Sequence, residues 1–156
     1  MIRKLTRIAI ASALLCAPIY ASAQDEAVIS YRQKVMGSIG ANMGAIGDIL
    51  KFSLPYTANI ARHAGQINTA ASLITSAFEQ NLAEGMTDAK SEIWNNWDEF
   101  EKFAQDLESA AGDLARAAES DDEIETMTAV ESLGEACKQC HEDFRKPEEE
   151  SYKKKM

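Results

Sequence analysis

The sequence predicts an all-α fold, an antiparallel four-helix bundle with up-down-up-down topology. Apolar residues recur at alternating steps of three and four along four segments, which is the pattern of helices with one buried face. Short connections between the segments favour antiparallel neighbours. Of the 156 residues 46% are hydrophobic but only 7% aromatic, which predicts a single domain whose core is built mainly from Ala, Leu, Ile and Met.

The first 23 residues have the features of a secretory signal peptide. Arg3, Lys4 and Arg7 precede an apolar run over 8–17, and the small residues of 21–23 fit a cleavage site after Ala23. The alternative is a membrane anchor, but the run is too short for a bilayer core of roughly 30 Å. We therefore expect a periplasmic protein that is not attached to a membrane after cleavage.

The mature domain is expected over 24–147. Its helices are predicted near 26–51, 56–83, 91–118 and 122–146. Pro55 separates the first pair, Gly85 marks the second connection, and Pro147 ends the last helix. Residues 148–156 carry no apolar stripe and are predicted to be a flexible charged tail.

The net charge limits the classes of partner. Removal of residues 1–23 removes three cations and no acid, so the net charge changes from −9 to −12. This charge argues against nucleic-acid binding, which requires a basic surface. The simpler consequence of this charge is solubility, and the more specific one is electrostatic steering toward a partner protein with a basic docking surface.

The chemistry of the chain is concentrated in the motif Cys137-x-x-Cys140-His141. This spacing is the attachment signature of c-type haem, in which two thiols form thioethers with the vinyl groups and the following imidazole binds the iron. On a helix Cys137 and His141 are four residues apart and share one face, which the apolar stripe predicts to be buried.

Other interpretations of the motif are weaker. A thioredoxin-like Cys-x-x-Cys requires a strand–helix context, and a structural zinc site requires four ligands, for which His63 is the remaining histidine. A disulfide between Cys137 and Cys140 within a helix strains the bond geometry and leaves His141 unexplained. A haem-free structural bundle is the remaining alternative. The sequence contains no recognisable nucleophile–base pattern or phosphate-binding loop, so we do not expect an enzyme.

The mature chain resembles the class II c-type cytochromes, the cytochrome c′ family, over essentially its whole length. The residues that carry the resemblance are Tyr31-Arg32-Gln33, Met36, Ile93-Trp94, Gly134, Cys137, Cys140, His141, Glu142, Phe144 and Arg145. The resemblance implies one covalent haem c attached to Cys137 and Cys140, with His141 as the proximal iron ligand. Family members often form dimers through the first two helices, so a homodimer is possible.

The resemblance also implies roles for four further residues. Met36 matches a position over the distal face of the haem, and Arg32 matches an arginine near the propionates. Arg145 matches a basic residue at the proximal edge, and Phe78 is a candidate pocket aromatic. Ordinary packing is the simpler alternative for Met36, and a favourable position at a helix C-terminus is the simpler alternative for Arg145. Arg32 lies within an apolar stripe, where a buried guanidinium requires an anionic partner such as a propionate.

The role of Met36 distinguishes two candidate functions. If its thioether binds the iron, the haem has His141/Met36 ligation, which suits electron transfer with a redox partner protein. If Met36 only packs, the iron is five-coordinate and binds nitric oxide or another small diatomic gas. The sequence slightly favours electron transfer, because methionine can act as a thioether ligand.

Overall fold

A computed structural model describes residues 17–120 and 122–154, with side chains from Ala23 onward. The predicted signal peptide lies outside this part of the chain except for 17–23, which form the start of the first helix. Cleavage after Ala23 therefore stays a prediction.

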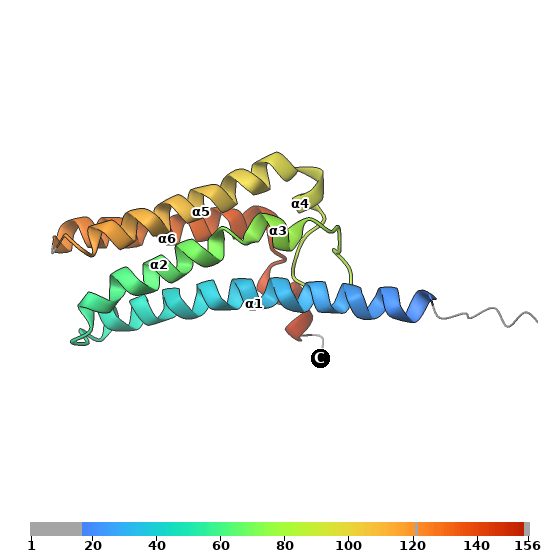
Figure 1. The fold of residues 1–156 in the computed structure, drawn as a ribbon, viewed down its shortest axis with the longest axis horizontal. Helices are drawn as coiled ribbons and strands as arrows, with labels where there is room; N and C mark the ends of the chain where they lie inside the picture. Colours follow the sequence, from blue (N-terminus) through green and yellow to red (C-terminus); the bar gives the residue numbers. More distant parts are fainter. Residues whose placement is uncertain (1–16, 121, 155–156) are drawn as a thin grey trace, which may run out of the picture.

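The fold is all-α, as predicted (Figure 1). Its four long helices are α1 (Ala17–Lys51), α2 (Ile60–Ala71), α5 (Trp97–Ala117) and α6 (Glu123–Phe144). The short elements are η1 (Thr57–Asn59), α3 (Ile74–Phe78), α4 (Glu92–Asn95), η2 (Glu148–Glu150) and η3 (Tyr152–Lys154). Within the described residues the β-type pairing is limited to an isolated bridge between Ala89 and Arg145.

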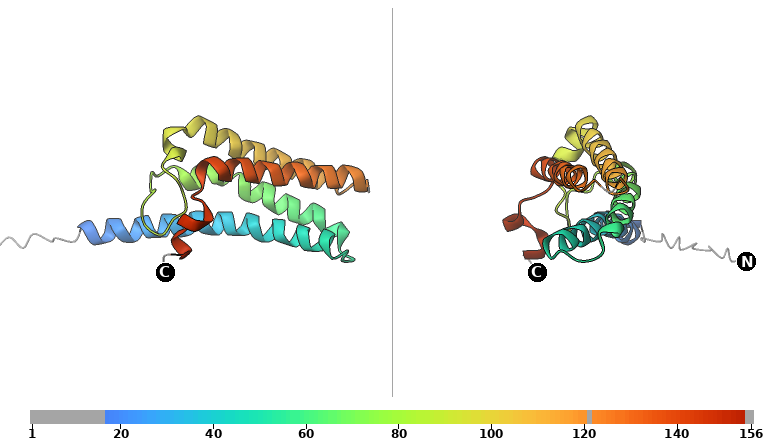
Figure 2. Two further views of the ribbon diagram at one scale, coloured as in Figure 1. Left: turned by 180° about the vertical axis from the view of Figure 1, so that it is seen from behind. Right: turned by 90° about the vertical axis from the view of Figure 1, so that its left-hand side faces the viewer.

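The long helices pack in chain order, α1 on α2, α2 on α5 and α5 on α6. In the end-on view of Figure 2, α6 and α1 lie toward the left of the bundle, and α5 and α2 lie toward the right. The largest fully buried side chains are Ile46, Ile67, Ile93, Leu114 and Leu133. Each of these lies at a position of the apolar stripes or immediately beside one, so helical periodicity accounts for the core.

The second predicted helix, 56–83, is wrong as a continuous element. The chain forms α2, a turn at Ser72 and Leu73, the short α3, and then a connection over 79–91 that contains Gly85 at φ +87°. The Ser72 hydroxyl donates to the carbonyl oxygen of Thr69 at 2.8 Å, a local hydrogen bond that competes with the helical pattern. The third helix is likewise interrupted, at Asn96.

Helix α6 begins one residue later than predicted and ends two residues earlier. The Asp122 carboxylate caps its N-terminus by accepting hydrogen bonds from the backbone N–H groups of Ile124 at 2.9 Å and Glu125 at 3.0 Å. The helix ends at Phe144, and Arg145 has an extended backbone. The residue immediately before Pro147 is disfavoured in a helix, so an end just upstream is expected.

The structure describes the predicted tail as far as residue 154. Ser151 lies between η2 and η3 and is buried with an exposed fraction of 5%. The Asp88 carboxylate accepts a hydrogen bond from the Ser151 hydroxyl at 3.0 Å. A polar anchor thus holds a segment that has no apolar stripe.

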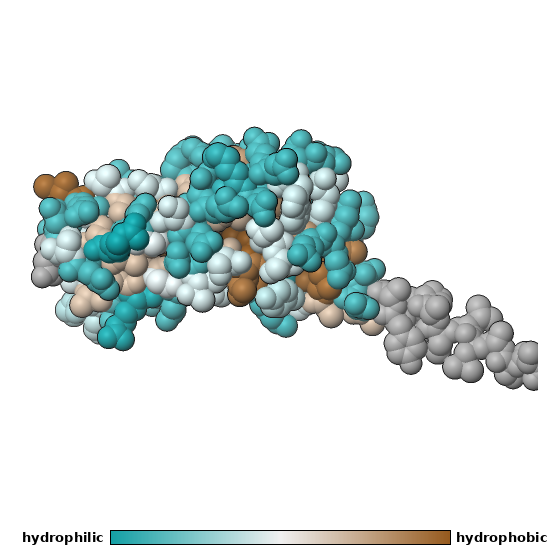
Figure 3. All heavy atoms as spheres, turned by 45° about the horizontal axis from the view of Figure 1, so that its top comes forward, coloured by the Kyte–Doolittle hydropathy of each residue, from teal (hydrophilic) through white to brown (hydrophobic). Residues whose placement is uncertain are grey.

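The visible surface is mainly hydrophilic, with apolar side chains in separate patches (Figure 3). Among the residues with described structure, none of the helices combines the length and apolar character needed to cross a membrane.

Candidate haem-binding site

A cavity of about 560 Å³ lies between α1 and α6. This is within the size range of sites for small organic ligands and cofactors. From α1 it is lined by Arg32, Gln33, Met36, Gly37, Ile39, Gly40, Met43 and Gly44. From α5, α6 and the residue that follows α6 it is lined by Phe100, Phe103, Ala104, Leu107, Cys137, Cys140, His141, Phe144 and Arg145. Helices from both ends of the chain therefore face one space.

The Cys137-x-x-Cys140-His141 motif lies on α6 with all three side chains at the cavity wall. Both cysteines are partly buried free thiols. His141 was expected on a buried face, but it is exposed at the cavity wall. The His141 side chain is accessible because the cavity is open to solvent, and exposed Gln33 also lines the cavity.

The surroundings keep the motif in its neutral form. Burial, together with the nearby Cys137 and Asp143, raises the pKa of the Cys140 thiol to about 12. Burial also raises the pKa of the Cys137 thiol. For His141, partial shielding from solvent at the cavity wall and, secondly, the nearby Arg145 lower the pKa of the imidazole. At neutral pH the imidazole is thus neutral, which is the form that binds a metal.

The α1 wall of the cavity combines two methionines with three glycines. Met36 and Met43 are partly buried and pack against the core. A Cβ added at Gly37, Gly40 or Gly44 would meet no atom within 4 Å outside the neighbouring helix backbone. The glycines therefore leave this stretch of the wall without side chains.

Arg32 has partners other than the anion that its burial led us to expect. Its side chain Nε donates to the Ala77 carbonyl at 2.9 Å and Nη1 to the Leu82 carbonyl at 3.0 Å, while Nη2 donates to the Gln80 carbonyl. The guanidinium carbon also lies 5.0 Å from the centre of the Phe78 ring. Carbonyl dipoles and an aromatic face stabilise this cation, so a carboxylate is not required for its burial.

These bonds also explain why the helix predicted to reach residue 83 ends at Phe78. A continuing helix would use the carbonyl oxygens of Ala77, Gln80 and Leu82 for its own backbone, but Arg32 binds them instead. The segment consequently leaves the helical path directly behind Phe78.

Phe78 lies at the cavity wall, where the sequence predicted a pocket aromatic. Its ring centre lies 5.2 Å from that of Phe100, and Phe100 lies 5.3 Å from Phe144 in an edge-to-face arrangement. Phe103 extends this aromatic group, with its ring centre 5.9 Å from that of Phe144. Such pairs contribute to stability beyond their buried area and give the cavity a stiff apolar wall.

Arg145 lies at the edge of the cavity beside His141, and its guanidinium is 3.7 Å from the Asp88 carboxylate. Lys90, two residues after Asp88, donates from its ammonium to the carbonyl oxygens of Glu142 at 2.8 Å and Asp143 at 3.1 Å. A cation thereby satisfies carbonyls at the C-terminus of α6. The connection over 79–91 is thus fixed to the helix that carries the motif.

His63 is not part of this site. Its Nδ1 lies 2.8 Å from the side-chain oxygen of Asn42, away from the cavity wall. Across 17–120 and 122–154 no three His, Cys, Asp or Glu side chains gather into a metal-binding group.

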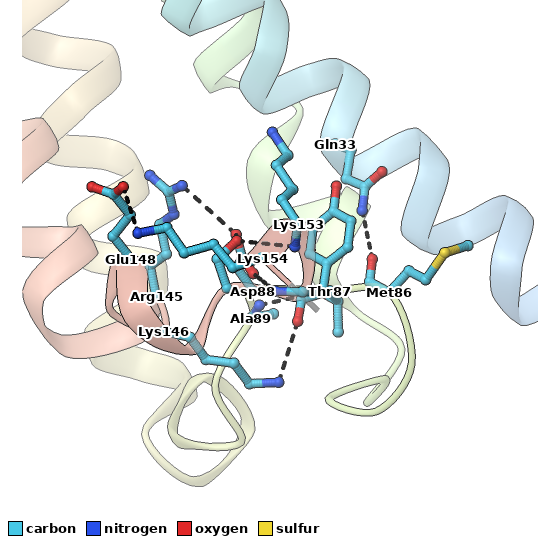
Figure 4. A network of polar contacts seen from close by, with 12 residues as sticks. Gln33, Met86, Thr87, Asp88, Ala89, Arg145, Lys146, Glu148, Lys153 and Lys154 are labelled. Atoms are coloured by element: carbon cyan, nitrogen blue, oxygen red, sulfur yellow. Dashed lines mark hydrogen bonds and ion pairs between the residues drawn. The ribbon is translucent and has the colours of Figure 1, made fainter. Parts of the chain in front are cut away.

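Several cavity-wall residues were not predicted from the sequence, among them the polar residues Asp88, Tyr152 and Lys153. Asp88 stands in a connection without periodicity, and the other two belong to a segment interpreted as a flexible tail. Their hydrogen-bonded network is shown in Figure 4. Asp88 meets Tyr152 and Lys153 because the chain after α6 turns back toward the connection over 79–91.

The donor set fits a covalent haem. Two thiols and a neutral imidazole face one cavity, whose walls are otherwise mostly aliphatic and aromatic. Helix α6 places the thiols three residues apart on the side that also carries His141. In such a haem the two thiols would be the covalent anchors and the imidazole would be an iron ligand.

Comparison with known proteins agrees with this geometry. The family model described as Cytochrome C′ matches residues 27–145. A cytochrome c′ from Pararhodospirillum photometricum is 36% identical over 124 residues, which cover 79% of this chain and 99% of that protein.

Solved structures are similar as well. Cytochrome c prime from Shewanella frigidimarina aligns with a TM-score of 0.74 and 28% identity, covering 79% of this chain and 97% of that one. A nitric oxide complex of a cytochrome c prime variant from Alcaligenes xylosoxidans aligns with a TM-score of 0.70 and 28% identity, again over 79% and 97%.

Proposed function

Because the chain belongs to the cytochrome c′ family and carries one covalent haem c, we propose that it binds a small uncharged diatomic gas such as nitric oxide. The haem supplies an iron centre with redox and gas-binding chemistry. The gas enters from the side of the cavity formed by α1, and the protein acts as a binding module, not as an enzyme.

The residues of α6 fix the cofactor in this proposal. Cys137 and Cys140 hold it covalently, and His141 presents a neutral imidazole to the iron because partial shielding from solvent and Arg145 lower its pKa. The aromatic wall around Phe100 excludes water from one side of the cavity. These groups bind and orient the haem, whereas α1 determines which molecules share the cavity with it.

The observation that carries the proposal is the composition of the α1 wall. Gly37, Gly40 and Gly44 leave space there, and Met36 and Met43 add apolar, adaptable side chains. A wall of this kind admits small uncharged molecules and disfavours charged ones. The nitric oxide complex of the related Alcaligenes protein supports the same choice.

Electron transfer is the second candidate, and Met36 favours it. A thioether at the cavity wall can serve as an axial iron ligand, and His/Met ligation raises the reduction potential of a haem. The acidic mature chain would then meet a redox partner with a basic docking surface.

Visible spectra of the haem-loaded protein separate the two candidates. The matched variants are Met36→Leu and Met43→Leu, since both methionines line the cavity from α1. For a gas-binding protein we expect high-spin spectra in the wild type and both variants, with ready nitric oxide uptake by each. A low-spin wild type that becomes high-spin only in Met36→Leu would establish Met36 as a ligand and favour electron transfer.

A haem-stained denaturing gel tests covalent attachment separately. After co-expression with cytochrome maturation machinery, the wild type should retain haem, and a Cys137→Ala/Cys140→Ala variant should lose it. Export of the chain to the periplasm and formation of a homodimer remain part of the proposal. N-terminal sequencing of the exported protein tests the first, because cleavage after Ala23 makes Gln24 the first residue.

A further inference from the structure

The last described segment of the chain, 147–154, closes one edge of the haem cavity. After Pro147 it forms η2 and η3, and Tyr152 and Lys153 line the cavity. The family match ends at residue 145, so the segment lies beyond the part shared with that model. We refer to residues 147–154 as the C-terminal strap.

Asp88 is the main anchor of the strap. Its side chain has an exposed fraction of 12%, and its two oxygens accept hydrogen bonds from the Ser151 hydroxyl and the Tyr152 backbone N–H, each at 3.0 Å. The Arg145 guanidinium at 3.7 Å adds a cation to this carboxylate. A largely buried, charge-assisted anchor of this kind is stronger than a surface contact.

Lys146 fixes the base of the strap to the same connection. Its ammonium donates to the carbonyl oxygens of Ala83 at 3.3 Å and Thr87 at 3.2 Å, and its backbone N–H donates to the Asp88 carbonyl at 2.7 Å. Figure 4 shows the contact between the Lys146 ammonium and the Thr87 carbonyl beside Asp88. The strap therefore has a defined position over the cavity edge.

The cations around the cavity are engaged to different degrees. Arg32 donates to three backbone carbonyls, and Arg145 pairs with Asp88. Lys153 is exposed at the cavity wall and takes part in none of the ion pairs among the described residues. In Figure 4 its side chain extends away from Asp88. Lys153 is thus the cavity-lining cation that is available to an anion.

We propose that the C-terminal strap is a haem-binding element in which Lys153 pairs with a propionate of haem c. A haem carries two carboxylates, and a carboxylate beside an apolar cavity is stabilised by a cation within reach. Ser151 and Tyr152 set the position of Lys153 through their bonds to Asp88. The inference depends on the haem and is independent of the choice between gas binding and electron transfer.

The test measures reduction potentials of the haem-loaded full-length protein in Lys153→Gln and Lys154→Gln. The two variants remove the same charge from neighbouring residues, but Lys154 pairs with Glu148 at 2.9 Å and is absent from the cavity wall. A cation near a propionate disfavours the more positive ferric haem, so Lys153→Gln should lower the potential. Lys154→Gln should leave it close to the wild-type value, and equal shifts in both variants would overturn the proposal.

Hydrogen exchange provides a second measurement. The backbone N–H of Tyr152 should be protected in the wild type and lose protection in Ser151→Ala, which removes one bond to Asp88. Ser151→Ala should also shift the potential in the same direction as Lys153→Gln. Rapid exchange at Tyr152 in the wild type would show that the strap is undocked and would refute it as a haem-binding element. Nitric oxide uptake, measured on the same samples, tests the proposed function separately.

Discussion

The Arg32 guanidinium carbon lies 5.1 Å from the centre of the Trp94 ring, and Arg32 is almost fully buried with an exposed fraction of 2%. Trp94 in turn donates from Nε1 to the Phe78 carbonyl oxygen at 2.8 Å. One cation and one indole thus hold the chain where it leaves α3 and begins the connection over 79–91. The wall of the haem cavity depends on this contact.

Replacement of Arg32 should therefore destabilise the fold. We expect Arg32→Lys and Arg32→Met each to lower the free energy of unfolding by about 2–4 kcal/mol, because both leave buried carbonyls unpaired. Urea unfolding followed by circular dichroism measures the change. Lys34→Met on the exposed side of the same helix is the control and should change stability by less than about 0.5 kcal/mol. Wild-type stability in Arg32→Lys would show that charge alone suffices.

Phe100 is the centre of the aromatic wall. It contacts Phe78 and Phe144 at ring-centre distances of 5.2 and 5.3 Å and has an exposed fraction of 2%. Phe100→Ala should lower the free energy of unfolding by about 3–5 kcal/mol through the lost burial and the cavity created. Phe52→Ala, at an exposed position, should cost much less. Thermal unfolding of the haem-loaded variants checks this, and similar losses at both positions would contradict the central role of Phe100.

Helical periodicity predicted the bundle, because the spacing of Ile, Leu and Ala along each helix indicates burial on one side. It predicted a buried face for the motif on α6, where the two cysteines are partly buried and His141 is exposed. It could not predict the break after Phe78. That break depends on Arg32, which is remote in sequence and binds the carbonyls of 77–82. The position of the C-terminal strap could not be predicted for the same reason, because its anchor Asp88 is a single polar residue far from Ser151 in the chain. The periodicity of apolar residues indicates local secondary structure. Polar contacts between residues far apart in the chain produce no such periodicity and cannot be predicted from it.

The end of α1 offers a stabilising substitution. Ser53 has φ +50°, and the Leu54 N–H donates to the Ile49 carbonyl at 2.9 Å while the Ser53 N–H donates to the Leu50 carbonyl at 3.4 Å. This is a Schellman motif, whose left-handed position favours glycine. Ser53→Gly should raise the free energy of unfolding by about 0.5–1 kcal/mol.

Gly85 provides the matched control for Ser53→Gly. It has φ +87°, so Gly85→Ala should lower stability by about 1 kcal/mol. Both changes are measured as shifts of the urea midpoint at an unchanged slope. A loss of stability in Ser53→Gly would contradict the left-handed backbone at that position.

The reactivity of Cys140 tests the surroundings of the motif in the haem-free chain. Burial first, then Cys137 and Asp143, raise the pKa of its thiol from 9.0 to about 12. At pH 8 the thiolate fraction is then about a thousandfold below that of a thiol with the unshifted pKa, and the thiolate is the reacting species. Iodoacetamide should therefore label Cys140 far more slowly in native buffer than in denaturant, as measured by mass spectrometry of peptides.

The raised pKa of Cys140 also makes the stability of the haem-free fold depend on pH. Because the folded-state pKa of Cys140 is raised, its contribution to stability is complete below pH 9 and is lost as the pH rises toward 12. Labelling in native buffer should accordingly continue to accelerate above pH 9, where labelling in denaturant levels off. Circular dichroism of the haem-free chain confirms that the labelled sample is helical. Equal labelling rates in a helical sample and in denaturant would show that the Cys140 thiol is not shielded.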